Sequence, residues 1–127
     1  MAGEPILIVD DNPVNLKLLR VLLRAEGYAI TTATDAEEAC AVLAGHHPRL
    51  ILMDLQLPGM DGLELTRRLK ADPITQDITI LALTAYAMTG DAERARAAGC
   101  DGYLAKPIDT RHLEEAVARC LGTKTGR

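Results

Sequence analysis

Apolar runs and amphipathic segments alternate along the whole chain. Short runs rich in aliphatic and β-branched residues predict five strands, at about 6–9, 28–32, 50–54, 78–83 and 102–105. Helical periodicity and capping residues predict five helices between and after them, at about 13–26, 35–43, 63–70, 89–98 and 110–121, and either Thr89 or Asp91 opens the fourth. Strict alternation favours a parallel sheet with helices on both faces. We predict an α/β fold, a doubly wound (βα)5 three-layer sandwich with the flavodoxin-like strand order 2-1-3-4-5.

Length and composition are those of one soluble domain. The 127 residues form a single predicted domain, 1–127, with a core at about 5–121 and a frayed tail at 122–127. Three cysteines, Cys40, Cys100 and Cys120, lack metal-ligand spacing, so we expect buried or half-buried thiols. The net charge of −4 argues against direct binding to nucleic acid or an anionic membrane. Without a signal peptide or an apolar run of about 18 residues, the expected location is the cytoplasm.

The third predicted strand ends on a carboxylate. Leu50 to Met53 are apolar and Asp54 follows them, although burying an ionised carboxylate is costly unless a partner compensates it. Asp54 is therefore either a hydrogen-bonded structural residue or a functional group at the strand end. In the predicted order, the neighbouring strands deliver further polar groups to the same edge, namely Asp10, Asp11, Thr84 and Lys106.

These residue types suit phosphoryl chemistry. Clustered carboxylates repel one another, and a hard divalent cation such as Mg²⁺ removes that repulsion. A carboxylate can also attack phosphorus and form an aspartyl phosphate, whose oxygens an ammonium and a hydroxyl would stabilise. Each residue also has a simpler role. Asp11 or Asn12 can cap the first helix, Thr84 can bond to the backbone, and Lys106 can be a surface charge.

Four segments together carry a family resemblance. They are Asp10-Asp11 after Ile6-Leu7-Ile8-Val9, the segment ILMDLQLPGMDG around Asp54, LTA with Thr84, and Tyr103-Leu104-Ala105-Lys106-Pro107. Over about residues 5–121 the chain resembles the receiver domain of two-component response regulators, the CheY-like superfamily. The segments LTAYAM, GDAER and GCDGYLAKPI are especially similar to those of DivK-type single-domain regulators.

The resemblance implies a role for each matched residue. Asp54 would accept a phosphoryl group from a phosphohistidine, and Lys106 would pair with that group. The implied Mg²⁺ ligands are Asp10 acting mainly through water, Asp11, Asp54 and the backbone carbonyl of Gln56. Thr84 and Tyr103 would act as the switch that changes the output face formed by the last two helices and the last strand. The chain would then be a phosphoacceptor rather than an enzyme, catalysing only its own phosphorylation and dephosphorylation.

The first helix carries two apolar stripes, and a surface helix needs only one. By resemblance, the stripe of Leu16, Leu19 and Leu23 packs inward. The docking surface for a sensor histidine kinase or a histidine phosphotransfer protein would then comprise Val14, Asn15, Leu18 and Pro107. We expect a monomer or weak dimer that signals to a downstream protein.

Alternatives stay open at this point. The chain can be a stand-alone receiver or a receiver excised from a hybrid sensor histidine kinase. A haloacid-dehalogenase-type phosphatase also uses a nucleophilic Asp on a parallel sheet, but it needs a second Asp where Gln56 stands. A nucleotide-binding module would need a glycine-rich loop in place of Asp10-Asp11-Asn12-Pro13. An interaction domain that works without phosphorylation is a further alternative.

Overall fold

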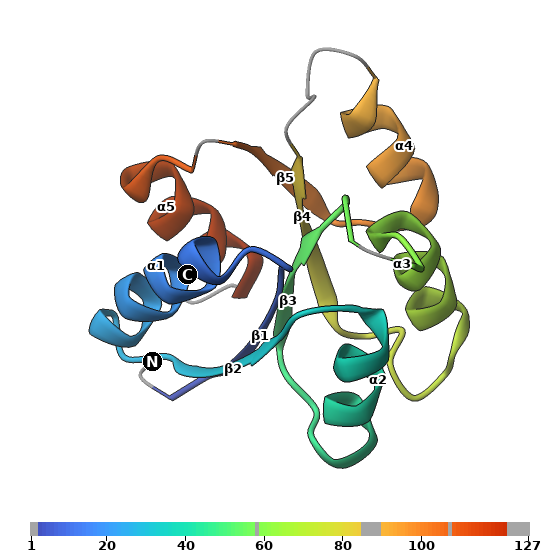
Figure 1. Cartoon of the computed structure of the whole chain (residues 1–127), viewed down its shortest axis with the longest axis horizontal. Coiled ribbons are helices and arrows are strands. Elements are labelled where there is room, and N and C mark those ends of the chain that lie inside the picture. The colour runs from blue at the N-terminus through green and yellow to red at the C-terminus, as the bar shows by residue number, and fades with distance from the viewer. Residues whose placement is uncertain (1–2, 58, 85–89, 107, 122–127) are drawn as a thin grey trace.

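The computed structural model describes residues 3–57, 59–84, 90–106 and 108–121. The described strands are β1 (Pro5–Val9), β2 (Ala29–Ala33), β3 (Leu50–Asp54), β4 (Thr79–Thr84) and β5 (Gly102–Ala105). The described helices are α1 (Pro13–Ala25), α2 (Ala36–Gly45), α3 (Gly62–Ala71), α4 (Asp91–Ala98) and α5 (Thr110–Leu121). All strand pairs are parallel and lie in the order β2-β1-β3-β4-β5, which confirms the predicted fold class and topology (Figure 1).

The sheet is the middle of three layers. Helices α1 and α5 cover one face, and α2, α3 and α4 cover the other (Figure 1). Successive residues of a strand point to opposite faces, so Ile51 and Met53 join the core under α2, α3 and α4, while Leu50 and Leu52 join the core under α1 and α5. This two-sided burial explains why β3 is a continuous apolar run.

Strand register brings the polar strand ends into one row. Val9 pairs with Met53, so the next residues, Asp10 and Asp54, lie side by side. Thr84 is the last residue of β4 and pairs with Ala105. The backbone N–H of Lys106 donates to the carbonyl of Thr84 at 2.7 Å, which fixes Lys106 beside the end of β4. The carboxyl edge of the sheet therefore collects the groups predicted to gather there.

The structure decides two local alternatives that the sequence left open and contradicts one prediction. Asn12 caps α1, since its side chain accepts from Val14 N at 2.9 Å, and this releases Asp11 from capping. Helix α4 begins at Asp91, one of its two predicted starts, after Gly90, whose φ is 93° and which provides no side-chain cap. Cys40 is exposed, contrary to expectation, because α2 buries Ala36 and Ala39 and turns Cys40 outward; Cys100 is buried and Cys120 is half-buried.

Several elements differ from their predicted limits by one or two residues, and α3, for example, begins at Gly62. Among the described helices, none has the length and apolar character needed to cross a membrane. The predicted frayed tail at 122–127 lies outside the described residues, as does the predicted docking residue Pro107.

Candidate phosphorylation and metal site

Asp54 is the last residue of β3 and is buried beside groups that stabilise its negative charge and a carboxylate that repels it. Only 2% of the residue is exposed. Its Oδ1 accepts a hydrogen bond from the backbone N–H of Gln56 at 3.0 Å, and its Oδ2 lies 3.1 Å from Lys106 Nζ. Burial raises the pKa of the Asp54 carboxyl and the nearby Asp10 charge raises it further, while the Gln56 N–H and Lys106 act in the opposite direction.

Asp10 is the second buried carboxylate. It is fully buried, and its Oδ1 accepts from the backbone N–H of Asn12 at 2.9 Å. Its Oδ2 accepts from the Asn15 side-chain amide at 3.4 Å and lies 3.8 Å from Lys106 Nζ. Lys106 thus stands between two buried carboxylates, closer to Asp54, and a single ammonium cannot neutralise both.

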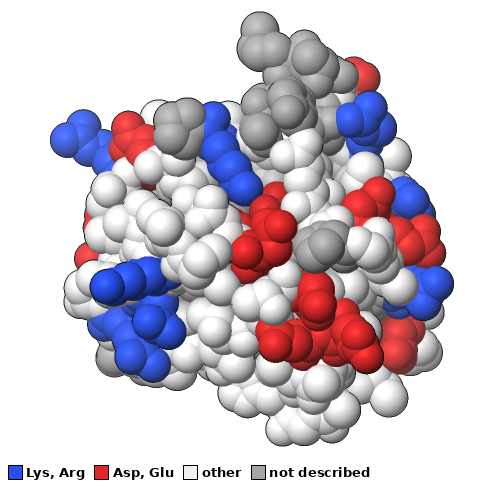
Figure 2. All heavy atoms as spheres, in the orientation of Figure 1, with Lys and Arg blue, Asp and Glu red and all other residues white. Residues whose placement is uncertain are grey.

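Asp11 completes an all-oxygen cluster. It is exposed, and one carboxylate oxygen from each of Asp10, Asp11 and Asp54 lies within 4.8 Å of the others. Figure 2 shows acidic side chains gathered near the ends of β1 and β3. Three carboxylates facing one ammonium leave an excess of negative charge, and oxygen donors are those that Mg²⁺ prefers. The donor set therefore fits a hard divalent cation.

Thr84 adds a hydroxyl-bearing side chain to this edge. The residue is fully buried, and Lys106 N–H bonds its carbonyl, so the ends of β4 and β5 are joined directly beside Asp54. The structure thus brings together Asp10, Asp11, Asp54, Thr84 and Lys106, as the strand order predicted. An anionic group placed here would meet a cation and a polar strand end rather than open solvent.

Comparison with known proteins shows the family to which this chain belongs. The family model for the response regulator receiver domain matches residues 6–118. The chain belongs to this family. Among curated receivers, the polar-differentiation response regulator DivK of Brucella ovis is 44% identical over 119 residues, which cover 94% of this chain and 97% of DivK. This receiver domain is accordingly similar to DivK along nearly its whole length.

Solved structures agree in fold and in sequence. A response regulator described as putative from Chloroflexus aurantiacus superposes with a TM-score of 0.91 at 33% identity, covering 94% of this chain and 98% of its own. The receiver domain of the sensor histidine kinase PA1611 from Pseudomonas aeruginosa has a TM-score of 0.87 at 39% identity, covering 95% of this chain and 99% of its own. That structure is described with a magnesium ion coordinated in the active-site cleft.

Gly62 lies against the backbone that carries Asp54, although nothing in the sequence predicts a role for it. The backbone N–H of Gly62 bonds the carbonyl of Leu55 at 3.2 Å, and Asp61 caps the helix by accepting from Glu64 N at 2.9 Å. A Cβ on Gly62 would lie 2.9 Å from Leu55 Cα and would also meet the backbone oxygen of Asp54. Only glycine lets α3 start this close to the end of β3. The sequence predicts the helix only from about residue 63, so the close approach of Gly62 to β3 becomes visible only in the structure.

The apolar stripes of α1 separate as predicted. Leu16, Leu19 and Leu23 are buried, whereas Val14 and Leu18 are 72% and 47% exposed. A hollow of about 400 Å³ beside Leu18 is also lined by Asp10, Asn15 and Lys106, so the exposed stripe continues toward the polar groups at the carboxyl edge of the sheet. Asn15, predicted only as a docking residue, in addition bonds Asp10.

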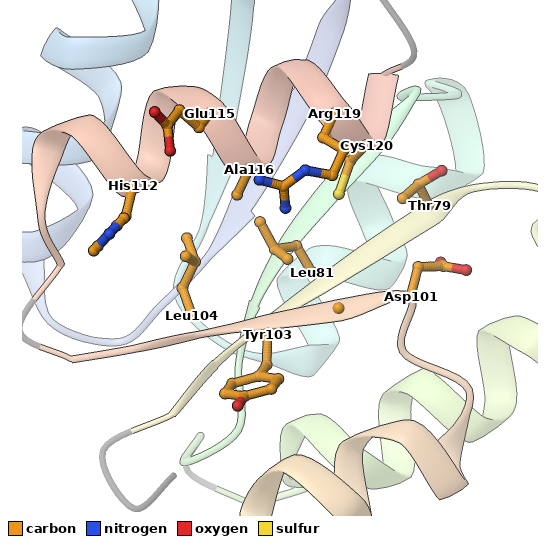
Figure 3. Close-up of a pocket in the computed structure, with 11 residues that line it drawn as sticks. Thr79, Leu81, Asp101, Tyr103, Leu104, His112, Glu115, Ala116, Arg119 and Cys120 are labelled. Carbon is orange, nitrogen blue, oxygen red and sulfur yellow. The ribbon is translucent and has the colours of Figure 1, made fainter.

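Tyr103 lies on β5 with 42% of the residue exposed. Figure 3 shows its ring on the opposite side of the strand from Leu104, which points toward α5. The groove between β5 and α5 has a volume of about 420 Å³ and an apolar floor that includes Leu81 and Leu104. Its polar rim carries His112 and Arg119 (Figure 3).

Proposed function

We propose that this receiver domain is a phosphorylation-dependent switch that accepts a phosphoryl group on Asp54. The donor is a phosphohistidine on a sensor histidine kinase or a histidine phosphotransfer protein. The observation that carries this proposal is Asp54 itself, a buried carboxylate 3.1 Å from Lys106 Nζ and beside the carboxylates of Asp10 and Asp11. A purely structural Asp would not need two further carboxylates at the same strand ends.

In the transfer, an oxygen of the Asp54 carboxylate attacks phosphorus and a new P–O bond forms. The P–N bond of the phosphohistidine breaks, and the imidazole keeps its electron pair and takes a proton from water. Lys106 already contacts Asp54 and supplies positive charge for the incoming oxygens, while Thr84 offers a hydroxyl. Asp10, Asp11, Asp54 and the Gln56 carbonyl would hold Mg²⁺, which supplies charge neutralisation when bound.

The switch would then act through Thr84 and Tyr103 on the α4-β5-α5 face. Helix α4 buries only small side chains among its described residues, Ala95 and Ala98, so it is weakly anchored. Rotation of Tyr103 from its exposed position would change the surface beside β5, including the β5–α5 groove. A downstream protein would read that change. The switch would work in the cytoplasm as a monomer or weak dimer, without direct contact to nucleic acid or membrane.

The kinase or phosphotransfer protein would dock on α1. Val14 and Leu18 offer exposed apolar surface that leads into the hollow beside Asp10, and Asn15 and Pro107 complete the predicted surface. A helix of the partner would bury this stripe and bring its phosphohistidine to Asp54.

Incubation with acetyl phosphate and Mg²⁺, followed by intact-protein mass spectrometry, tests the central step. We expect the mass of one phosphoryl group to be gained by the parent chain and not by Asp54→Asn. Omission of Mg²⁺ should slow the gain strongly. An equal gain in Asp54→Asn, or no gain in the parent chain, would overturn the assignment of Asp54.

A receiver from a hybrid sensor histidine kinase is the second candidate, and the 39% identity to the PA1611 receiver favours it. Both candidates share the chemistry at Asp54. An immunoblot of native cells separates them, since a stand-alone regulator gives a band of the size of 127 residues and a hybrid kinase gives a much larger one.

A further inference from the structure

Lys70 lies at the amino edge of the sheet, opposite the edge that carries Asp54, and its ammonium group has three hydrogen-bond acceptors there. It lies in the last turn of α3, and its side chain is 22% exposed. Its Nζ donates to the carbonyl of Ile78 at 2.8 Å, to Asp101 Oδ2 at 3.1 Å and to the carbonyl of Gln76 at 3.4 Å. An ammonium has three donors, so all three have acceptors here. Lys70 thereby ties α3 to the start of β4 and to the residue before β5.

Asp101 strengthens the connection between the two strands. It lies directly before β5 (Figure 3), and its Oδ2 also accepts from the backbone N–H of Ile80 at 2.8 Å. Its own backbone N–H donates to the Ile80 carbonyl at 2.7 Å. Asp101 is thus held to β4 by both its backbone and its side chain, with charge assistance from Lys70.

The stem of Lys70 packs against the turn that joins α4 to β5. Gly99 ends α4 with a φ of 110°, and a Cβ on it would lie 2.9 Å from Lys70 Cγ. One turn earlier in α3, Thr66 Oγ1 lies 3.8 Å from the buried Cys100 Sγ. The segment from Gly99 to Asp101 therefore packs against α3 at Gly99 and Cys100 and is bonded to β4 through Asp101.

The other end of α4 is held differently. Gly90 has a φ of 93°, gives no side-chain cap, and has no atom within 4 Å of the place where a Cβ would stand. The described part of α4 contributes only Ala95 and Ala98 to the buried core. Among the described residues, the α4–β5 unit thus has more contacts with α3 and β4 at Gly99–Asp101 than at Gly90.

We propose that Lys70 is a positioning residue that makes Gly99–Asp101 a fixed pivot for the switch. Phosphorylation would move the Gly90 end of α4 and the Tyr103 end of β5 about this pivot, and the start of β5 would stay in place. This inference rests on the proposed phosphorylation of Asp54.

Amide hydrogen exchange, with and without beryllofluoride and Mg²⁺, tests the pivot. In the wild-type chain we expect exchange to change at Gly90–Arg94 and at Tyr103–Lys106 and to stay constant at Gly99–Asp101. Lys70→Met keeps the apolar stem and removes the donors. In this variant, exchange at Gly99–Asp101 should become about tenfold faster or more, and it should now respond to beryllofluoride.

Arg68→Met is the matched control, because it removes another cation of α3 that makes only an exposed pair with Glu64 at 3.1 Å. It should leave Gly99–Asp101 unchanged. Asp101→Asn should resemble Lys70→Met, and the double variant should add little to either single one.

Three results would overturn the pivot. If beryllofluoride changes amide exchange in the wild-type chain as strongly at Gly99–Asp101 as at Tyr103, the pivot is refuted, while the proposed phosphorylation of Asp54 still stands. Unchanged exchange at Gly99–Asp101 in Lys70→Met removes the role of Lys70. If beryllofluoride changes amide exchange at no position of the wild-type chain, the proposed phosphorylation of Asp54 is refuted. The pivot is then refuted as well, because it rests on that phosphorylation.

Discussion

Adding one methyl group at Gly62 should disturb both stability and phosphorylation, because Gly62 lies against the backbone that carries Asp54. The new Cβ of Gly62→Ala would stand 2.9 Å from Leu55 Cα, whereas carbon atoms prefer separations of about 3.5–4.0 Å. At least about 0.6 Å of movement is therefore needed to relieve the contact. The contacted atoms belong to the backbone of Asp54 and Leu55, so no side chain can simply rotate away.

The size of the effect follows from this geometry. Overpacking of a tightly packed position typically costs about 1–3 kcal/mol of unfolding free energy. If α3 moves as a unit, the Gln56 N–H and the end of β3 shift with it, and Asp54 loses its position relative to Lys106. A misplacement of about 1 Å in such a site can lower a rate by about a hundredfold. We expect a loss of about 1–3 kcal/mol and a loss of phosphorylation rate between about tenfold and a hundredfold.

Urea unfolding followed by circular dichroism measures the first effect, and the rate of mass gain with acetyl phosphate measures the second. Gly45→Ala is the matched control, since Gly45 ends α2 and has no atom within 4 Å of an added Cβ. That variant should be neutral or slightly stabilised, because alanine loses less entropy than glycine on folding. Gly62→Ala with the stability and phosphorylation rate of Gly45→Ala would refute the steric reasoning.

Further predictions concern the charges and the docking stripe. The pKa of the Asp54 carboxyl is raised in the folded state, so ionisation of Asp54 lowers the unfolding free energy as pH rises above the ordinary carboxyl range. In urea unfolding without Mg²⁺ at neutral pH, Asp54→Asn should therefore have a higher unfolding free energy than the wild-type chain. The difference between the two proteins should shrink in acid. Mg²⁺ at ten times its Kd should stabilise the wild-type chain by about 1.4 kcal/mol, measured as a rise in unfolding free energy. Lys106→Met should cost about 1–3 kcal/mol, since it leaves two buried carboxylates without their cation. Leu18→Lys should keep its fold by circular dichroism but receive phosphate poorly from its kinase; normal transfer would contradict the docking role of α1.

Much of this structure follows from patterns that are local in the sequence. The run Leu50 to Met53 predicts a strand buried on both faces, and its end at Asp54 follows directly. Because strands and helices alternate, the strands are parallel and their carboxyl ends lie at one edge of the sheet. The sequence therefore predicts that Asp10, Asp54, Thr84 and Lys106 lie close together, as they do in the structure. Helical spacing separates the two apolar stripes of α1, but it does not tell which of them packs inward; that assignment came from the family resemblance, and the burial of Leu16, Leu19 and Leu23 confirms it.

Other features depend on contacts between distant segments and leave no local pattern. The approach of Gly62 to Leu55 depends on the angle at which α3 leaves the sheet, and the bonds of Lys70 to Asp101 join residues 31 positions apart. Neighbouring polar residues with similar propensities also stay ambiguous. Asp11 and Asn12 both suit an N-cap, and only the structure shows that Asn12 takes that role and leaves Asp11 to the acidic cluster.

The two edges of the sheet differ in how completely their charges are compensated. At the amino edge, the ammonium of Lys70 meets one carboxylate and two carbonyls, and each of its donors has an acceptor. At the carboxyl edge, the single ammonium of Lys106 faces the carboxylates of Asp10 and Asp54, with Asp11 close by. A cation or a phosphoryl group therefore changes the electrostatic energy mainly at the carboxyl edge. At the amino edge the charge of Lys70 is already compensated, so a new charge at Asp54 changes the electrostatic energy there very little. The structural response to phosphorylation is therefore expected to begin at Asp54 and to leave Lys70 and its partners in place.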